Sequence, residues 1–297
     1  MVESITLKAR AKINLTLDIL GKRPDGYHEL STVMQSLELY DTLVIKTIEK
    51  QGLDDIILET DCPTLPTDEN NLVYKAARLI LKEHNVQQGV HIYLHKRIPL
   101  AAGLAGGSSD CAATLWGLNT LLGLNVANER LFEMGRQLGA DVPFCLFANF
   151  INNHGTALAE GIGEKLTPLP LHPDVWILLA RLPIEVSTQE IFSRFGAMQP
   201  LPIERTPSML EALETQKLPL ICFCLGNGLT DIAVSMHPEI HTLITLLQGQ
   251  EALGVNMTGS GPTVFAYFPS KSAACSAVNA LESQAKLDIF LTKPQGI

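Results

Sequence analysis

The sequence predicts a mixed fold of helices and strands, arranged in two domains. Its 297 residues exceed the roughly 150 that one domain typically uses, so two domains with separate cores are expected. Apolar and polar residues alternate over residues 4–17, and a period of two is typical of a strand. Residues 71–84 and 128–138 predict helices, and Gly139 ends the second of them. Strand and helix patterns therefore occur in the same chain.

The composition is that of a globular protein with a small ligand. Hydrophobic residues make up 46% of the chain and charged residues 18%, so disorder is not expected. The net charge of -9 argues against a nucleic-acid partner, because such a surface needs a basic face. The longest apolar runs fall far short of the roughly 20 residues of a membrane helix, and the N-terminus lacks an apolar signal core. We therefore expect a cytoplasmic protein with no membrane partner.

Further elements follow in order along the chain. Residues 21–26 are dense in turn formers and end the first strand, and later segments predict strands at 41–46, 91–96 and 176–180. Two more strands flank the small residues 258–262, and Ser187 or Thr188 can cap a helix. The turn-rich segment 161–165 predicts a boundary between an N-terminal domain, residues 1–164, and a C-terminal domain, residues 165–297.

The cysteines are expected to be reduced. There are six of them, scattered along the chain with no C-x-x-C pair, which does not favour a disulfide framework or a metal site. Cys222, Phe223 and Cys224 alternate as residues of a strand would. We therefore expect a strand at 222–224.

Small residues crowd the segment 99–109, which opens onto an apolar helix. Backbone N–H groups can converge there on one ligand, and the start of a helix favours phosphate. Ser108 or Ser109 can cap the helix or turn its hydroxyl to a phosphate or its metal ion. The P-loop pattern does not fit, because Ser108 and not a lysine follows Gly107, and the dinucleotide fingerprint does not fit by spacing. A helix whose small residues only allow close packing is the alternative.

Two further features have both a functional and a plain structural explanation. One face of the first strand carries a polar stripe, which is either a solvated face or part of a site: Lys8, Arg10, Lys12 and Asn14. Asp141 follows a helix end and precedes the apolar run 142–147. Its carboxylate is either a turn former or a placed base.

Three motifs in this order resemble the signature set of the galactokinase, homoserine kinase, mevalonate kinase and phosphomevalonate kinase (GHMP) superfamily. They are AKINL at 11–15, PLAAGLAGGSS at 99–109 and TGSGP at 258–262. The segment 21–30 is similar to that of the members that phosphorylate a cytidine diphospho-polyol in the non-mevalonate route to isoprenoids. The resemblance implies a two-domain α+β fold, with an N-terminal domain like ribosomal protein S5 domain 2 and a C-terminal ferredoxin-like domain. It also implies an active site in the cleft between them.

The resemblance further implies which residues form the site. Asp141 matches the catalytic base and Lys12 its partner. The residues that match the substrate site are Asn14, Tyr27, His28, Thr188 and Phe192. Those that match the ATP site are Asn71, Lys96, Pro99, Gly103, Leu104, Ala105, Gly106, Gly107, Ser108 and Ser109. ATP is the implied co-substrate, and Mg²⁺ is expected to arrive with it, because no cluster of carboxylates in the sequence marks a metal cage.

Two other functions stay open at this point. Another kinase of the superfamily, acting on homoserine, mevalonate or a sugar, would share the phosphate loop but would not need the Gly26-Tyr27-His28 turn. A nucleotide-binding sensor would keep the fold without turnover, but the joint presence of Lys12 and Asp141 argues against it. Ala101 and Ala102 stand where some relatives have glycine, which is expected to stiffen the loop. We expect a monomer or a weak homodimer whose partners are the polyol substrate and ATP.

Overall fold

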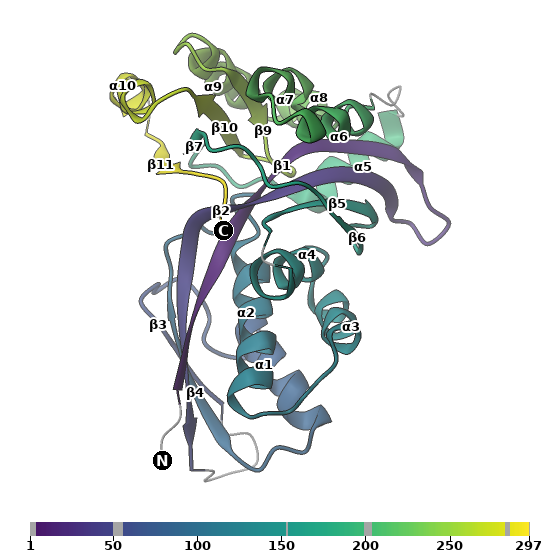
Figure 1. Ribbon diagram of the computed structural model, residues 1–297, viewed down its shortest axis with the longest axis vertical. Coiled ribbons are helices and arrows are strands. Elements are labelled where there is room, and N and C mark those ends of the chain that lie inside the picture. Colours follow the sequence, from purple (N-terminus) through teal and green to yellow (C-terminus); the bar gives the residue numbers. More distant parts are fainter. Residues whose placement is uncertain (1–3, 50–55, 153, 199–203, 283–285, 297) are drawn as a thin grey trace. The chain divides into compact units, whose positions relative to one another are not determined.

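The computed structural model describes residues 4–49, 56–152, 154–198, 204–282 and 286–296 (Figure 1). Contacts within the chain define two compact units. Unit 1 comprises residues 1–11, 39–100 and 105–153, and unit 2 comprises residues 12–38, 101–104 and 154–297. The long strands β1 (Ser4–Lys22) and β2 (His28–Ile48) therefore supply residues to both units. The boundary of the family domains at residues 164 and 165 stays a prediction.

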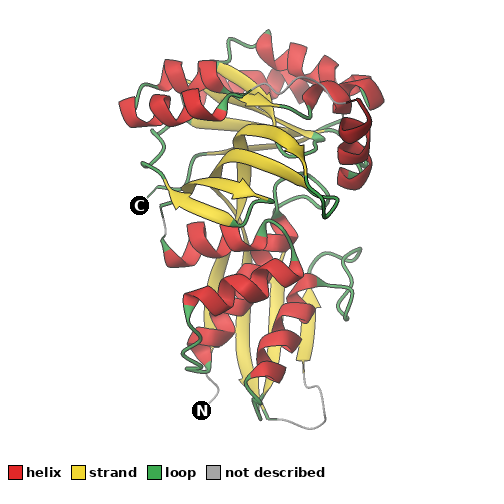
Figure 2. Ribbon diagram, turned by 90° about the vertical axis from the view of Figure 1, so that its right-hand side faces the viewer, coloured by secondary structure: helices red, strands yellow, loops and turns green. Residues whose placement is uncertain are grey.

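Unit 1 is a sheet with helices against one face (Figures 1 and 2). Strand β4 (Gly89–His95) pairs in parallel with β3 (Ile56–Thr60) and antiparallel with β2. The register places Leu43 opposite Leu94 and Ile45 opposite Ile92, and all four side chains are buried. The remaining elements are α1 (Leu72–Glu83), α2 (Gly106–Leu121), α3 (Asn128–Leu138), α4 (Val142–Leu146) and one π-helical turn, η1 (Phe147–Ile151).

Helix α2 approaches the sheet of unit 1 closely at Gly117. A Cβ atom at this position would lie 2.8 Å from Cδ1 of Ile45, so a larger residue fits only if the side chains of the sheet move aside. The same helix buries Ala112, Ala113 and Leu115 completely. Close packing therefore explains the small residues in the middle of α2.

Unit 2 contains a second, four-stranded antiparallel sheet. Its strand order is β11 (Asp288–Thr292), β7 (Trp176–Arg181), β10 (Thr263–Phe268) and β9 (Gly254–Met257). Elsewhere in unit 2, β2 pairs with β5 (Thr156–Gly161), β5 with β6 (Lys165–Pro168), and β1 with β8 (Gly226–Asn227).

Helices of unit 2 complete its core. They are α5 (Thr188–Met198), α6 (Thr206–Thr215), α7 (Leu218–Cys224), α8 (Thr230–Met236), α9 (Pro238–Gln248) and α10 (Lys271–Glu282). Helices α9 and α10 contact strand β10 (Figure 1). The core they share with this sheet includes Leu178, Leu243 and Val264, none more than 2% exposed. Burial of these apolar side chains stabilises unit 2.

Most of the predicted elements are confirmed. The expected helices at 71–84 and 128–138 are α1 and α3, and the strands expected around 258–262 are β9 and β10. No helix in the ranges described above is long and apolar enough to cross a bilayer. All six cysteines lie within those ranges, and each is a free thiol.

The strand expected at 222–224 is wrong, because these residues end helix α7. Cys222 and Cys224 are buried and Phe223 is 78% exposed, so the alternation itself is real. Ile221, next to Cys222, is also buried, as the apolar face of a helix requires. Three residues are too few to distinguish a period of two from the helical period.

Strand β1 changes its surroundings along its length. Lys8 is exposed, and its ammonium lies 4.6 Å from the centroid of the Tyr40 ring. From Ala11 to Ile19 every residue is buried, and Lys12 and Asn14 are each only 4% exposed. The explanation of the polar stripe as a solvated face therefore holds for Lys8 and fails for Lys12 and Asn14. Buried polar groups need hydrogen-bond partners.

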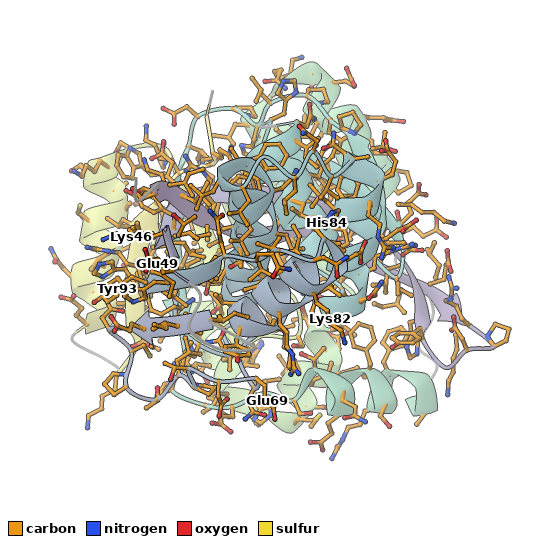
Figure 3. The ribbon with its side chains drawn as sticks, turned by 90° about the horizontal axis from the view of Figure 1, so that it is seen from below. Lys46, Glu49, Glu69, Lys82, His84 and Tyr93 are labelled. Atoms are coloured by element: carbon orange, nitrogen blue, oxygen red, sulfur yellow. The ribbon has the colours of Figure 1, made fainter. Side chains whose placement is uncertain are left out.

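The lower end of unit 1 is a polar surface. Seen from below, Lys46, Glu49 and Tyr93 lie on the side of the strands, and Lys82 and His84 lie near the end of α1 (Figure 3). Charges of both signs are interspersed on this face. Such a mixture does not favour nucleic-acid binding, which requires an excess of positive charge.

A buried histidine in unit 2 is held neutral by its removal from water. Nδ1 of His172 donates to the carbonyl oxygen of Pro173 at 2.7 Å, and Nε2 accepts from the hydroxyl of Tyr267 at 3.1 Å. Burial lowers the pKa of His172 to about 4. Protonation would leave the second ring nitrogen as an additional donor in an apolar environment, which is unfavourable.

We predict that unit 2 loses stability on acidification through His172. In the unfolded chain the imidazole has its ordinary pKa of 6.5, so between pH 6.5 and about 4 the unfolded state binds the proton more readily. The stabilising contribution of neutral His172 to the free energy of unfolding is complete above pH 6.5. It decreases by up to about 3 kcal/mol as the pH falls towards 4. Urea unfolding at several pH values measures this. A His172→Gln variant should show a smaller change over the same range, and an equal change in both proteins would contradict the prediction.

Candidate active site

The loop 99–109 contains three residues in the left-handed region. Ala101, Gly103 and Ala105 have φ values of 50°, 72° and 56°. This conformation costs a residue with a side chain roughly 1–2 kcal/mol, so the surrounding structure must hold both alanines there. Residues 101–104 of the loop belong to unit 2 and the remainder to unit 1.

In unit 2, Gly103 packs against the turn 258–262. A Cβ atom on Gly103 would lie 2.7 Å from the carbonyl oxygen of Thr258 and 3.1 Å from that of Gly261. The next residue, Leu104, accepts a hydrogen bond through its carbonyl oxygen from the backbone N–H of Lys12 at 3.0 Å. This part of the loop is therefore held between the turn and β1, at a distance that only glycine allows.

Asn14 connects the same segments through its side chain. Its Oδ1 accepts hydrogen bonds from Nζ of Lys12 at 2.9 Å, from the backbone N–H of Gly259 at 3.1 Å and from the hydroxyl of Thr258 at 3.2 Å. Its Nδ2 donates to the hydroxyl of Thr32 at 2.9 Å. Asn14 therefore orients the Lys12 ammonium and joins β1, β2 and the turn. Its expected contact with substrate stays a prediction.

Helix α2 begins at Gly106, so neither predicted serine caps it. The capping residue is Ala105, which offers no side-chain hydrogen bond. The hydroxyl of Ser109 is buried and accepts from Nδ2 of Asn149 in η1 at 3.2 Å. The N–H groups of the first turn have no acceptor within the helix, and the helix dipole favours an anion beside them. Gly106, Gly107 and Ser108 form this first turn, and their binding of phosphate stays a prediction.

Lys96 lies in a buried network of charges in unit 1. Its ammonium contacts Oδ2 of Asp41 and donates to Oδ2 of Asp110 at 2.7 Å. Burial alone would lower the pKa of Lys96, but the charges of Asp110 and Asp41 raise it above the usual value. Burial and the neighbouring charge of Asp41 raise the pKa of Asp110, against the opposing effect of Lys96. Nζ of Lys96 lies 3.3 Å from the position of a Cβ on Gly106, so this ammonium stands beside the start of α2.

Asp141 precedes the short helix α4 and is partly exposed. Its carbonyl oxygen accepts from the N–H of Cys145 at 3.1 Å, but its side chain forms no capping hydrogen bond with the helix. Nearby in unit 1, a Cβ on Gly139 would lie 3.6 Å from the hydroxyl of Ser108. The carboxylate is therefore not used for helix capping, and its role as catalytic base stays a prediction.

An aromatic cluster in unit 2 brings together residues from β2 and α5. The ring centroid of His28 lies 5.3 Å from that of Phe192 and 5.9 Å from that of Phe195. Nε2 of His28 is buried and has no hydrogen-bond partner among the residues described. Burial and the charge of Lys22 lower the pKa of His28, so the ring is neutral near pH 7. Tyr27 is 61% exposed and stands outside the cluster.

Thr188 and Asn71 have structural partners within their own units. The hydroxyl of Thr188, at the start of α5, forms a hydrogen bond of 2.8 Å with the hydroxyl of Ser260. Asn71 caps α1, because its Oδ1 accepts from the N–H of Val73 at 2.8 Å. Its Nδ2 donates to the carbonyl of Pro66 at 2.7 Å. The contacts of both residues with ligands stay predictions.

The structure brings most of the predicted residues into three groups. Lys12, Asn14, Gly103 and Leu104 gather at the turn 258–262, which Thr188 also contacts through Ser260. His28 lies with Phe192, and Lys96 lies with Gly106. Sequence reasoning missed the residues that hold these groups, namely Thr32, Asp41, Asp110 and Asn149. Asp110 directly follows the two serines and is the one for which the sequence offered a nearby signal.

Comparison with known protein families assigns the class. The model of the GHMP kinase N-terminal domain matches residues 71–149, and that of the GHMP kinase C-terminal domain matches residues 209–287. The chain is thus a GHMP kinase, and the predicted two-domain α+β fold is confirmed.

Individual relatives show which family of GHMP kinases the chain belongs to. A 4-diphosphocytidyl-2-C-methyl-D-erythritol kinase from Caldicellulosiruptor saccharolyticus is 45% identical and covers 96% of this chain and 95% of its own length. One from Brevibacillus brevis is 43% identical, with 98% and 97% covered. A crystal structure of a 4-(cytidine 5'-diphospho)-2C-methyl-D-erythritol kinase has a TM-score of 0.80 at 32% identity, covering 98% of this chain and 100% of that one. The chain therefore belongs to the 4-diphosphocytidyl-2-C-methyl-D-erythritol kinase family.

We predict that Gly103→Ala weakens ATP binding by about tenfold or more, since a misplaced phosphate-binding backbone loses several contacts. The added methyl group would meet the Thr258 carbonyl oxygen at 2.7 Å, and φ is 72°, so residues 101–104 must shift. Isothermal titration with ATP and a melting curve measure the effect. Gly21→Ala is the control, because no atom lies within 4 Å of its Cβ position. Parent-like affinity in a folded Gly103→Ala protein would refute the assignment.

Proposed function

We propose that this chain transfers the γ-phosphoryl group of ATP to the 2-hydroxyl of 4-diphosphocytidyl-2-C-methyl-D-erythritol, giving the 2-phosphate and ADP in the non-mevalonate isoprenoid pathway. The family relationship supports the reaction. The observation that carries the choice of substrate is the cluster of His28, Phe192 and Phe195, with a buried and unpartnered His28 Nε2.

The cytosine ring fits the chemistry of this cluster. Aromatic side chains bind a planar base through stacking, typically for about 1–3 kcal/mol. The neutral imidazole of His28 has one nitrogen that donates and one that accepts, and the edge of cytosine offers an amino donor beside acceptors. Tyr27 is exposed next to His28 and can close over a bound base. Asn14 and Thr188 are proposed to contact the polyol or diphosphate part.

Phosphoryl transfer requires an oriented hydroxyl, a base and positive charge around the γ-phosphate. Asp141 is proposed to take the proton of the acceptor hydroxyl, since its partly exposed carboxyl group at the start of α4 can be reached by a bound substrate. Lys12 is proposed to neutralise charge on the transferring group, because Asn14 holds its ammonium at 2.9 Å. A buried ammonium in a fixed position stabilises developing negative charge without reorganisation.

The loop and the start of α2 are proposed to bind the ATP phosphates. The backbone N–H groups of Gly106, Gly107 and Ser108 supply the donors, and Gly103, Leu104 and Ala105 shape the loop. Asn71, Lys96 and Pro99 are proposed to lie towards the nucleoside. In the described part of the chain no three acidic, histidine or cysteine side chains group as metal ligands, so Mg²⁺ would be held mainly by phosphate oxygens and water. The hydroxyl of Ser108 is the side-chain oxygen at the helix start that suits it.

The proposal also includes the cellular compartment and the oligomeric state. We propose that the protein works in the cytoplasm on small-molecule substrates, as a monomer or a weak homodimer. An assay for ADP release separates the proposed acceptor from homoserine, mevalonate and free methylerythritol. Turnover with the cytidine diphospho form and little with the others is expected, since remote binding energy positions the reacting hydroxyl. Comparable turnover on a small alcohol would refute the proposed substrate.

We predict that Asp141→Asn lowers kcat by roughly two to four orders of magnitude, the usual contribution of a placed base. ATP affinity and the melting temperature should stay close to those of the parent, because asparagine has nearly the same size and shape and the position is partly exposed. Asp174→Asn is the control, since it removes a carboxylate that is 74% exposed and paired only with Lys293. Parent-like turnover by folded Asp141→Asn would exclude Asp141 as the base.

We predict that Phe192→Ala lowers kcat/KM for the cytidine substrate by roughly one to two orders of magnitude, the worth of one stacked base. ATP affinity should change little. The control is Phe223→Ala, which removes the same side chain from a position that is 78% exposed. If Phe192→Ala discriminates against free methylerythritol as well as the parent does, the cytidine site lies elsewhere.

A further inference from the structure

The segment that leads into the phosphate loop is held by one buried carboxylate. Oδ1 of Asp41, on β2, accepts hydrogen bonds from the backbone N–H groups of Arg97 at 2.5 Å and Ile98 at 2.8 Å. Its Oδ2 contacts the ammonium of Lys96. Asp41 therefore fixes three consecutive residues directly before Pro99, where the loop begins.

The same ammonium reaches the helix that follows the loop. Nζ of Lys96 donates to Oδ2 of Asp110, which lies in the second turn of α2, at 2.7 Å. It also lies 3.3 Å from the Cβ position of Gly106, the first residue of that helix. A continuous path of hydrogen bonds thus runs from β2 through Lys96 to α2, all of it within unit 1.

Burial makes these links far stronger than those of surface ion pairs. The exposed fractions of the Lys96, Asp41 and Asp110 side chains are 6%, 0% and 3%. An exposed pair is easily exchanged for water, whereas a buried charge that loses its partner is left uncompensated at high cost. The ammonium therefore has one favourable position, and that position determines the distance between the entry to the loop and the start of α2.

We infer that Asp41, acting through Lys96 and Asp110, is a positioning residue for ATP. It fixes the entry of the loop relative to the first turn of α2. The backbone N–H groups of that turn, on Gly106, Gly107 and Ser108, are thereby oriented for phosphate before ATP binds. The inference rests on the proposed ATP site. Donors held in place before binding lose little entropy when the ligand binds, so the network acts on ATP affinity more than on chemistry.

Asp41→Asn tests this with a change of one atom. The asparagine Oδ1 still accepts from Arg97 and Ile98, but its amide N–H groups face the Lys96 ammonium, so the link to Lys96 is lost. We expect the Kd for ATP and the KM for ATP to rise about tenfold or more. The KM for the cytidine substrate should stay within about twofold, since a local change in the ATP loop leaves the binding energy of the other substrate intact.

Asp61→Asn is the matched control. Asp61 also accepts from the backbone N–H of the same residue, Lys96, at 2.9 Å and pairs with His95 at 3.0 Å, but it is exposed and does not touch the ammonium. Its removal should leave ATP affinity unchanged. If Asp41→Asn does not fold, Asp110→Ala cuts the same path at its α2 end and leaves Lys96 paired with Asp41.

The outcomes separate this inference from the proposed function. ATP binding is measured by isothermal titration without the acceptor, and stability by a melting curve without ATP. A large loss of ATP affinity in a folded Asp41→Asn or Asp110→Ala variant, with Asp61→Asn like the parent, supports the positioning role. Parent-like ATP affinity in either folded variant, or a loss only in kcat, overturns it. If the parent itself binds no ATP, the proposed function has failed instead.

Discussion

The buried amide of Asn14 is the interaction on which the arrangement of β1, β2 and the turn 258–262 in unit 2 depends. An amide removed from water is stable only when its donors and acceptors are satisfied. Asn14 meets this requirement through groups on three segments, and its partners Thr258 and Gly259 lie more than two hundred residues away in sequence. The position of Lys12, the shape of the turn 258–262 and the space for Gly103 are therefore linked. A change in any one of them disturbs the others.

The two units hold their parts of the loop by different chemistry. Unit 2 uses neutral hydrogen bonds around Asn14 and a glycine contact at Gly103. Unit 1 uses a buried ammonium between two carboxylates. Because the groups around Asn14 other than Lys12 are neutral, they add no charge to the loop. The positive electrostatic potential of the loop then comes from Lys12 and from the start of α2. The charged network of unit 1 already contains two acidic groups for one ammonium, so Lys96 is more suited to positioning than to neutralising the triphosphate.

The aromatic cluster of His28, Phe192 and Phe195 is the proposed site of substrate selection. His28 comes from the start of β2 and Phe192 from the first half of α5, so the cluster exists only when these elements pack together. Desolvation keeps the imidazole neutral, which preserves both a donor and an acceptor for the edge of a base. In the proposed binding mode, stacking and hydrogen bonding to the base supply selectivity, and the catalytic groups need no contact with the base.

The sequence by itself determined the elements and the class of protein, and the tertiary structure decided which side chains do what. Periodicity and turn residues are local properties, so helix 128–138 and the strands around 258–262 could be predicted, and the three motifs indicated the superfamily. Local patterns were insufficient where they were short, as at 222–224, or where the helix start shifted, as at Ser108 and Ser109. The partners of buried polar groups could not be predicted. Asp41 is 55 residues from Lys96, and Asn14 is 244 residues from Thr258, so only the packing of distant segments shows that Asp41 holds the loop and that Asn14 orients Lys12.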